Sequence, residues 1–103
     1  MLPRLRWTDK ARDDLLDIYI AIGRAQPAAA ERYFDRIEAK ATLLTALPRI
    51  GVRRTDIRPG LRMLVQAPYL ILYRVEPDTD EGEVSVVEIV RVVDGRRELT
   101  HLF

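Results

Sequence analysis

Arginine is concentrated in one stretch of the chain, residues 48–74, which has no lysine or histidine and a single acid, Asp56. The guanidinium group presents a planar fork of donors that matches the oxygens of phosphate and carboxylate groups. Because it stays charged at any working pH, it is a poor group for transferring protons. The stretch therefore predicts a surface that binds anionic groups. Its six arginines are Arg49, Arg53, Arg54, Arg58, Arg62 and Arg74.

Side chains that could transfer protons are scarce. The chain has one histidine, His101, and no cysteine, so neither a disulfide nor a zinc site of the usual ligands is expected. Both lysines, Lys10 and Lys40, fall on predicted helix surfaces. A nuclease would have to rely on His101, Asp94 or Tyr73, and Asp94 precedes a glycine, which is typical of a turn residue.

We expect no metal or cofactor. Residues 78–82 carry three acids and a glycine and come closest to a calcium loop. Their pattern departs from that of an EF-hand loop, and no helices are predicted on either side. A solvated hairpin turn is therefore expected there.

Charge is unevenly distributed along a chain whose formal net charge is +1. Residues 49–74 carry six basic side chains and one acid, whereas residues 75–90 carry six acids and no basic side chain. Two interpretations of the arginines stay open. They could form a solvated rim that pairs with Asp56 and the acidic loop, or they could receive acidic groups of a partner. Exposed ion pairs contribute only about 0–1 kcal/mol each, so the fold does not require so many.

Length and composition indicate one globular domain over residues 1–103, with 48% hydrophobic residues. No stretch approaches the roughly 18 uncharged apolar residues that a membrane span needs. The first residues lack the apolar segment of a secretory signal. We therefore expect a cytoplasmic protein without membrane contact.

The first half of the chain has the pattern of a strand followed by two helices. Residues 2–7 alternate apolar and basic side chains, which indicates a short edge strand. Thr8 is predicted to cap a helix that ends at Gly23. A second apolar stripe at helical spacing predicts a helix over residues 27–47. The break between the helices spans only residues 24–26, so the two must form an antiparallel hairpin.

The second half reads as a loop and three strands. Prolines and glycines predict a loop over residues 48–60, and strands are expected at 61–67, 69–75 and 83–93. Residues 96–103 form a tail without a clear pattern. The whole pattern predicts an α+β fold of order β-α-α-β-β-β, in which the helical hairpin covers one face of a mainly antiparallel sheet of three or four strands. The other face is expected to be exposed, with the spare arginines near it.

Two strand arginines differ from the others because they follow apolar positions. Arg74 and Arg91 are expected to form half-buried ion pairs, with Glu88 or Asp17 as partners. Tyr73 lies on the same strand as Arg74 and is expected to pack in the core.

Four groups of residues follow one another along nearly the whole chain. They are Trp7-x-x-x-Ala11-x-x-Asp14-Leu15-x-x-Ile18, then Ala29-Ala30-x-x-Tyr33-Phe34-x-x-Ile37 with Leu44-x-x-x-Pro48-x-x-Gly51, then Gly60-Leu61-Arg62 with Tyr69-Leu70-Ile71-Leu72-Tyr73-Arg74-Val75, and finally Val90-Arg91-Val92. In this order they resemble the ParE/RelE superfamily of toxins from bacterial type II toxin–antitoxin modules. The resemblance implies a compact β-α-α-β-β-β domain that a co-expressed antitoxin neutralises.

The resemblance also implies partners. The antitoxin of such a module typically has a DNA-binding N-terminal half and a C-terminal segment that wraps the toxin. We expect a ParD-like antitoxin with a ribbon-helix-helix start, a hetero-oligomeric complex, and contact with operator DNA only through the antitoxin. Apolar residues outside the main helical stripes should form a groove for an amphipathic helix of the antitoxin. They are Leu16, Ile20 and Leu43.

Two branches of the superfamily differ in their target. RelE-like members cut mRNA in the ribosomal A site with lysine, arginine and tyrosine, whereas ParE-like members inhibit DNA gyrase and are not hydrolases. This chain has no lysine after Lys40 and no tyrosine after Tyr73, and Asp94 stands where the superfamily commonly has histidine. The resemblance therefore favours a ParE-like toxin that inhibits DNA gyrase by binding, with growth inhibition and plasmid stabilization as its role.

The alternatives are a ribosome-dependent mRNA endoribonuclease of RelE type and an inactive toxin that only binds antitoxin. For the ribonuclease, the candidate catalytic residues are the three proton-transfer groups named above. For the gyrase inhibitor, the target would be contacted by arginines of the sheet and the tail. These are Arg53, Arg54, Arg58, Arg62, Arg91, Arg96 and Arg97.

Overall fold

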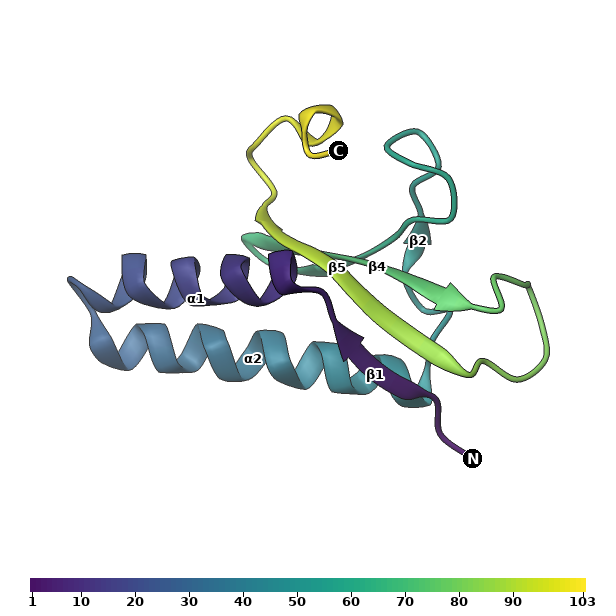
Figure 1. Ribbon diagram of the computed structural model, residues 1–103. Coiled ribbons are helices and arrows are strands. Elements are labelled where there is room, and N and C mark those ends of the chain that lie inside the picture. Colours follow the sequence, from purple (N-terminus) through teal and green to yellow (C-terminus); the bar gives the residue numbers. More distant parts are fainter.

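The computed structural model describes residues 1–103, apart from the side chain of residue 100. Strand β1 (Arg4–Trp7) is followed by helices α1 (Asp9–Gly23) and α2 (Pro27–Ala46). The predicted cap is confirmed, because Thr8 Oγ1 accepts a hydrogen bond of 3.0 Å from the backbone N–H of Ala11. The helices lie side by side as the predicted antiparallel hairpin (Figure 1). None of the helices in the described part of the chain is long and apolar enough to cross a membrane.

The remaining elements complete one sheet of five strands in the order β1-β5-β4-β3-β2. Only the β1–β5 pair is parallel, and the other three pairs are antiparallel. The helical hairpin packs on one face of this sheet (Figure 1). The predicted α+β class and the mainly antiparallel sheet are thereby confirmed. The bounds are β2 Val52–Arg53, β3 Arg62–Gln66, β4 Tyr69–Glu76, β5 Val86–Asp94 and a short 3-10 helix η1 Leu99–His101.

The predicted number of strands was wrong. The sheet has five strands because the expected loop over residues 48–60 contains β2, which pairs through Val52 with Met63. A strand of two residues is too short to show an alternating pattern. Strand β5 starts at Val86 and not at residue 83, where the sequence predicted it. Its partner β4 ends at Glu76, and Pro77 has no N–H with which to continue the ladder.

Strand β5 contains a one-residue bulge. Tyr73 of β4 pairs with Ile89, and the residue before it, Leu72, pairs with Arg91. Val90 therefore has no counterpart on β4. Val90 packs against the apolar cluster on the sheet face opposite the helices. The bulge therefore places one extra side chain on that face. On the side of the helices, the core residues of β5 are Val87 and Ile89 before the bulge and Val92 after it.

The larger core lies between the helices and the sheet. Ala11, Ile37, Leu44, Ile71 and Ile89 are fully buried there. They come from both helices and from the neighbouring strands β4 and β5, as the periodicity of the sequence predicted. Tyr73 is fully buried in the same core, so its predicted packing role is confirmed.

The opposite face of the sheet is partly covered, whereas the sequence predicted an exposed face. Leu61, Leu72 and Val93 form a second buried cluster, against which Ile57 and Leu102 pack. The loop before β3 and the C-terminal tail supply this cover, and both stand on the side of the sheet away from α2 (Figure 1). The tail therefore has a structural position that its sequence did not reveal.

Candidate functional site

The acidic loop between β4 and β5 lies against the arginine-rich segment. Arg53 is within 3.3 Å of Asp78 and 3.0 Å of Asp80, and Arg62 is 3.4 Å from Asp78. Arg49 donates to the backbone carbonyls of the same loop, at 2.7 Å to Thr79 and 3.0 Å to Gly82. Pairing with this loop was one of the two interpretations left open by the sequence, and it holds for Arg53 and Arg62. Arg54 pairs with Asp56 at 2.9 Å, in agreement with the same interpretation.

A second set of charges forms a neutral quartet across three strands. Glu88 of β5 accepts hydrogen bonds of 2.8 Å from Arg6 and from Arg74. Glu76 lies 2.8 Å from Arg74 and 3.7 Å from Arg6. Burial acts to raise the pKa of Glu88, but the hydrogen bonds from Arg74 and Arg6 together outweigh it, so this pKa lies below its ordinary value. The predicted pairing of Arg74 with Glu88 is confirmed.

Arg91 pairs with Asp14, and the prediction of Glu88 or Asp17 as its partner was wrong. Both nitrogens of its guanidinium edge donate to the Asp14 carboxylate, at 2.7 and 2.9 Å. The same carboxylate accepts the backbone N–H of Val92 at 3.0 Å. Asp14 faces the second half of β5 because α1 continues beside it after β1 has ended. Helical position alone did not distinguish Asp14 from Asp17.

The three candidates for proton transfer are in unequal positions. Tyr73 is enclosed, with its hydroxyl donating to the Pro48 carbonyl and accepting the Gly51 N–H, each at 2.9 Å. Burial raises its pKa. Hydrogen bonds from Arg96 lower the pKa of Asp94 to about 2, which makes this carboxylate a weak base. The imidazole of His101 is exposed and lies 3.6 Å from Glu98.

The seven arginines predicted to contact a target differ widely in exposure. Arg62 and Arg91 are buried, with 4% and 9% of their surface exposed, so neither is presented to a partner. Arg96 is exposed and pairs with Asp94, the last residue of β5. Arg58 and Arg97 are exposed, and Arg58 stacks on the ring of Phe103. Arg53 and Arg54 form the ion pairs described above.

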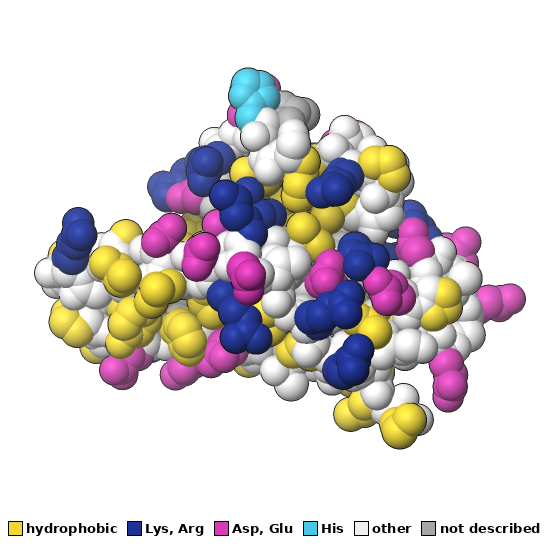
Figure 2. All heavy atoms as spheres, in the orientation of Figure 1, with side chains coloured by type: hydrophobic (Ala, Val, Ile, Leu, Met, Phe, Trp, Pro, Cys, Tyr) yellow, Lys and Arg dark blue, Asp and Glu magenta, His cyan; other side chains and the backbone are white. Residues whose placement is uncertain are grey.

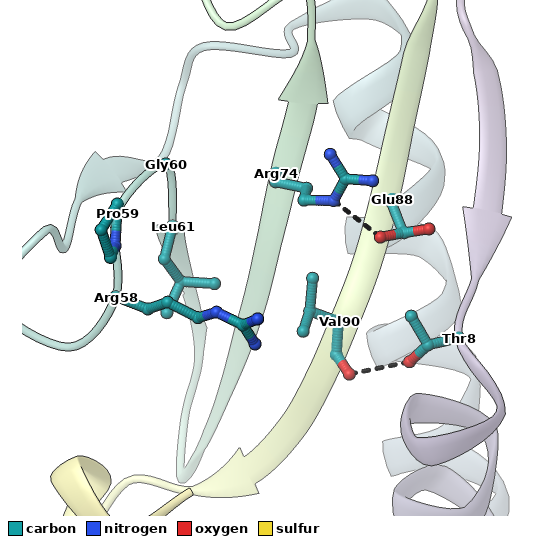
Figure 3. A pocket seen from close by; sticks show the side chains of 8 residues that line it. All are labelled: Thr8, Arg58, Pro59, Gly60, Leu61, Arg74, Glu88 and Val90. Atoms are coloured by element: carbon teal, nitrogen blue, oxygen red, sulfur yellow. Dashed lines mark hydrogen bonds and ion pairs between the residues drawn. The ribbon is translucent and has the colours of Figure 1, made fainter. Parts of the chain in front are cut away.

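Arg58 also lines a hollow of about 490 Å³ on the sheet face opposite the helices. Figure 3 shows its guanidinium extending from the loop before β3 toward Val90, while Arg74 turns toward Glu88. Thr8 closes one side and donates through its hydroxyl to the Val90 carbonyl at 2.8 Å. The hollow is thus built from β4, β5, the loop before β3 and the residue that caps α1.

A different surface is formed by the helical hairpin. Leu16 and Ile20 of α1 are 54% and 45% exposed, and Leu43 of α2 is 38% exposed. These are large exposures for leucine and isoleucine in helices that also carry core residues. Figure 2 shows hydrophobic side chains gathered over the part of the molecule where the hairpin lies. Such a gathering is typical of a protein interaction site.

An apolar hollow of about 370 Å³ adjoins this surface. Leu16 lines it, but Ile20 and Leu43 do not. Leu43 is nine residues beyond Phe34 on α2, which corresponds to about 14 Å along a helix, so the three predicted residues do not form one compact patch. The sequence interpretation missed Trp7 and Phe34 because both belong to core stripes. The residues around the hollow are Trp7, Arg12, Leu15, Leu16, Phe34 and Glu38.

Comparison with solved structures relates the fold to toxin–antitoxin systems. The chain superposes with a TM-score of 0.70 and 26% identity on a chain of the chromosomal ParDE toxin–antitoxin system from P. aeruginosa, covering 90% of this chain and 96% of that one. It also superposes with a TM-score of 0.61 on a chain of the RelBE2 toxin–antitoxin complex from Mycobacterium tuberculosis, at 24% identity, covering 91% and 99%. The second likeness shows a shared fold.

Sequence comparison narrows the relationship to one family. Toxin ParE3 of Caulobacter vibrioides is 41% identical over 70 residues, which cover 68% of this chain and 63% of the relative. Toxin ParE1 of Mycobacterium tuberculosis is 36% identical over 61 residues, or 59% of each chain, so less than two thirds of these relatives' length is matched. Residues 5–99 match the model of the family described as the ParE toxin of the type II toxin–antitoxin system parDE. The chain therefore belongs to the ParE toxin family.

Proposed function

We propose that this chain is the toxin of a type II toxin–antitoxin module, that it inhibits DNA gyrase by binding, and that an antitoxin neutralises it at the helical hairpin. Family membership over residues 5–99 supports the toxin role. The main support for an antitoxin site at the hairpin is the exposed apolar surface around Leu16, next to the hollow of about 370 Å³. An amphipathic helix with leucine-sized side chains would fill that hollow and cover Leu16.

The antitoxin in this proposal is ParD-like, with a ribbon-helix-helix DNA-binding half, and the complex is hetero-oligomeric. Operator DNA is then contacted through the antitoxin alone. Such a division of labour agrees with the charge of the toxin, because most of its sheet arginines are paired with its own carboxylates. Gyrase is a cytoplasmic target, so the proposal includes a cytoplasmic site of action.

Inhibition by binding, without catalysis, is supported by the state of the candidate proton-transfer groups. The hydroxyl of Tyr73 is buried, and Asp94 has a pKa of about 2. His101 would be left to act alone, although RNA cleavage requires a base, an acid and stabilisation of phosphate charge. Of the seven arginines predicted to contact a target, Arg58 and Arg97 are exposed and form no ion pair with the residues that the structure describes, and Arg96 is exposed beside Asp94.

Purified toxin should be tested in a gyrase supercoiling assay and, in parallel, in ribosome-programmed cleavage of mRNA. We expect inhibited supercoiling and intact mRNA. The combined variant Arg58→Gln, Arg96→Gln and Arg97→Gln should weaken inhibition. The matched control, Arg24→Gln with Arg32→Gln and Arg36→Gln, removes the same charge from the helices and should leave inhibition unchanged.

Two outcomes would overturn the choice of target. Unaffected supercoiling together with codon-paced cleavage would favour a ribosome-dependent endoribonuclease. Expression without antitoxin supplies the other test, because a gyrase inhibitor should stop growth. Unhindered growth with folded protein in the cell would favour an inactive toxin that only binds its antitoxin.

A further inference from the structure

Arg58 lies between two adjoining hollows on the sheet face opposite the helices. The larger, of about 490 Å³, is the one described above, and the smaller, of about 260 Å³, extends from Arg58 to Phe103. Thr8, Arg58 and Val90 line both hollows. We call the two together the Arg58 trough.

Two cations of the trough, Arg58 and Lys10, form no ion pair with the part of the chain that the structure describes. Of the residues that the structure describes, none places a carboxylate within ion-pair distance of Arg58 or Lys10. The other two cations of the lining are already paired, Arg74 with Glu76 and Glu88, and Arg91 with Asp14. Arg58 and Lys10 therefore differ from the other cations of this face.

The geometry of Arg58 suits a carboxylate. Its guanidinium carbon lies 4.9 Å from the centre of the Phe103 ring, so one face of the group is stacked. Stacking leaves the donor edge of a guanidinium free for two parallel hydrogen bonds to one carboxylate. In Figure 3 this guanidinium points toward Val90 and away from the body of its own loop.

The walls around these cations are apolar. Leu61 is buried and Val90 and Leu102 are half-buried, whereas 47% of the surface of Phe103 is exposed. An apolar side chain next to the bound carboxylate would cover part of the Phe103 ring. Glu88, the one acid that lines the larger hollow, already accepts hydrogen bonds from Arg6 and Arg74 and adds no unbalanced negative charge.

The number of unpaired cations decides between a nucleic acid and a protein ligand. A nucleic acid strand carries one charge per phosphate, and its binding depends on several accessible cations along its path. The trough offers two, and the neighbouring quartet of Arg6, Arg74, Glu76 and Glu88 is neutral. A single carboxylate with an apolar neighbour fits this arrangement better than a chain of phosphates.

We propose that the Arg58 trough binds a segment of a partner protein in which a glutamate or aspartate stands beside a leucine-sized apolar residue. The carboxylate pairs with the donor edge of Arg58, with Lys10 adding attraction at longer range. The apolar neighbour lies against Val90 and Phe103. This inference rests on the proposed function, since it gives the chemistry of the protein segment that a binding toxin would recognise.

The test uses the full chain and the acetylated, amidated tripeptide Leu-Glu-Leu as a probe. Arginine Nε–H resonances are followed by NMR while the peptide is added at millimolar concentrations. The Arg58 resonance should shift and saturate with Leu-Glu-Leu, but it should not respond to Leu-Gln-Leu. Arg58→Gln should weaken peptide binding by about tenfold or more, and Arg58→Lys should weaken it less, because lysine keeps the charge but loses the fork. Arg24→Gln, at an exposed position in the hairpin turn, is the control and should bind the peptide normally.

Three outcomes would overturn the proposal. The first is equal binding of the glutamate and glutamine peptides, or no saturable shift at all. The second is unchanged peptide binding by Arg58→Gln. The third is tighter binding of a short oligothymidine or of inorganic phosphate than of the peptide, which would identify a phosphate site. The gyrase assay stays independent, because a chain that binds the peptide but leaves supercoiling untouched would contradict the proposed function and not the trough.

Discussion

The arginine-rich sheet and the helical hairpin make opposite use of their residue types. In the sheet and its loops, Arg53, Arg74 and Arg91 each meet carboxylates of the same chain. On the hairpin, Leu16 and Ile20 have no such internal partner and stay about half exposed. The region that is richest in binding chemistry by composition is therefore largely satisfied by itself. The region that looked ordinary by composition is the one left unmatched.

This contrast shows that a binding surface is better identified by unmatched groups than by residue type. A guanidinium that is already bound to a carboxylate gives up that partner when it binds another, so little net attraction remains. An exposed leucine gives up only water when a partner covers it, and each fully buried side chain of that size contributes about 1.5–3 kcal/mol. Four predictions test this division, from the largest expected effect to the smallest.

The first concerns the ion pair of Asp14 and Arg91, whose side chains are 14% and 11% exposed. Asp14→Asn removes the charge that faces Arg91, of which only 9% is exposed, and it weakens the hydrogen bond to Val92 N–H. We expect the free energy of unfolding to fall by about 3 kcal/mol, near the lower end for a broken buried pair. Urea denaturation measures this change. Asp17→Asn is the control on the same helix and should have little effect on the free energy of unfolding. Equal losses of stability in the two variants would show that the pair of Asp14 and Arg91 does not stabilise the fold more than an exposed aspartate does.

The second concerns the unmatched surface of the hairpin. Leu16→Asp should raise the Kd for the antitoxin by about 100-fold, or about 2.7 kcal/mol, because it places a charge in an apolar contact. The stability of the free toxin should barely change, since Leu16 is 54% exposed. Calorimetric titration of the antitoxin gives the affinity, and Ala25→Asp in the hairpin turn is the control of equal charge. Equal losses of affinity and stability would show Leu16 to be an ordinary core residue.

The third concerns the hydroxyl of Tyr73. Tyr73→Phe keeps the ring but leaves the Pro48 carbonyl and the buried Gly51 N–H without their partner. Such unsatisfied buried groups should cost about 2 kcal/mol of stability. Thermal unfolding followed by circular dichroism checks the loss. Inhibition of supercoiling by the folded variant should be unchanged, and a selective loss of activity would give Tyr73 a direct role in function.

The fourth concerns the quartet around Glu88. Because the pKa of Glu88 is lower in the folded chain than its ordinary value, its contribution to stability is present above the ordinary pKa and is lost as the pH falls through the folded pKa. Glu88→Gln should therefore cost about 1 kcal/mol at neutral pH, reduced by the exposure of its partners, and almost nothing in strong acid. Urea denaturation at several pH values measures the difference. A cost that does not change with pH would mean that the ion pairs with Arg6 and Arg74 are not its source.

Much of the fold follows from local patterns that the sequence displays. The Thr8 cap, the two helical stripes and the apolar strand around Ile89 depend on spacing within a few residues, and all are present, although the strand starts three residues later than predicted. β2 escaped prediction because its two residues acquire strand geometry only by pairing with β3. The position of the tail likewise depends on Leu102 meeting the cluster around Leu72, a contact between segments far apart in the sequence.

The candidate sites were less predictable than the fold. The counts of charge in the arginine-rich and acidic segments indicated that they could pair, but they did not show which arginines would be left over. Arg53 pairs with Asp78 and Asp80 of the acidic loop, whereas Arg58 stacks on Phe103, and the sequence shows neither contact. The apolar hollow beside Leu16 combines Trp7, at the end of β1, with Phe34 of α2, and no local pattern joins two such positions.

The bulge at Val90 offers a way to change the surface of this chain without changing its strand pairing. A regular strand alternates its side chains between the two faces, so deleting Val90 would leave the residues of β5 that face the helices in their places and make the ladder continuous. The Arg58 trough would lose a wall that both of its hollows share. A chain shortened by that single residue would thus keep its fold and lose the part of the trough that Val90 forms.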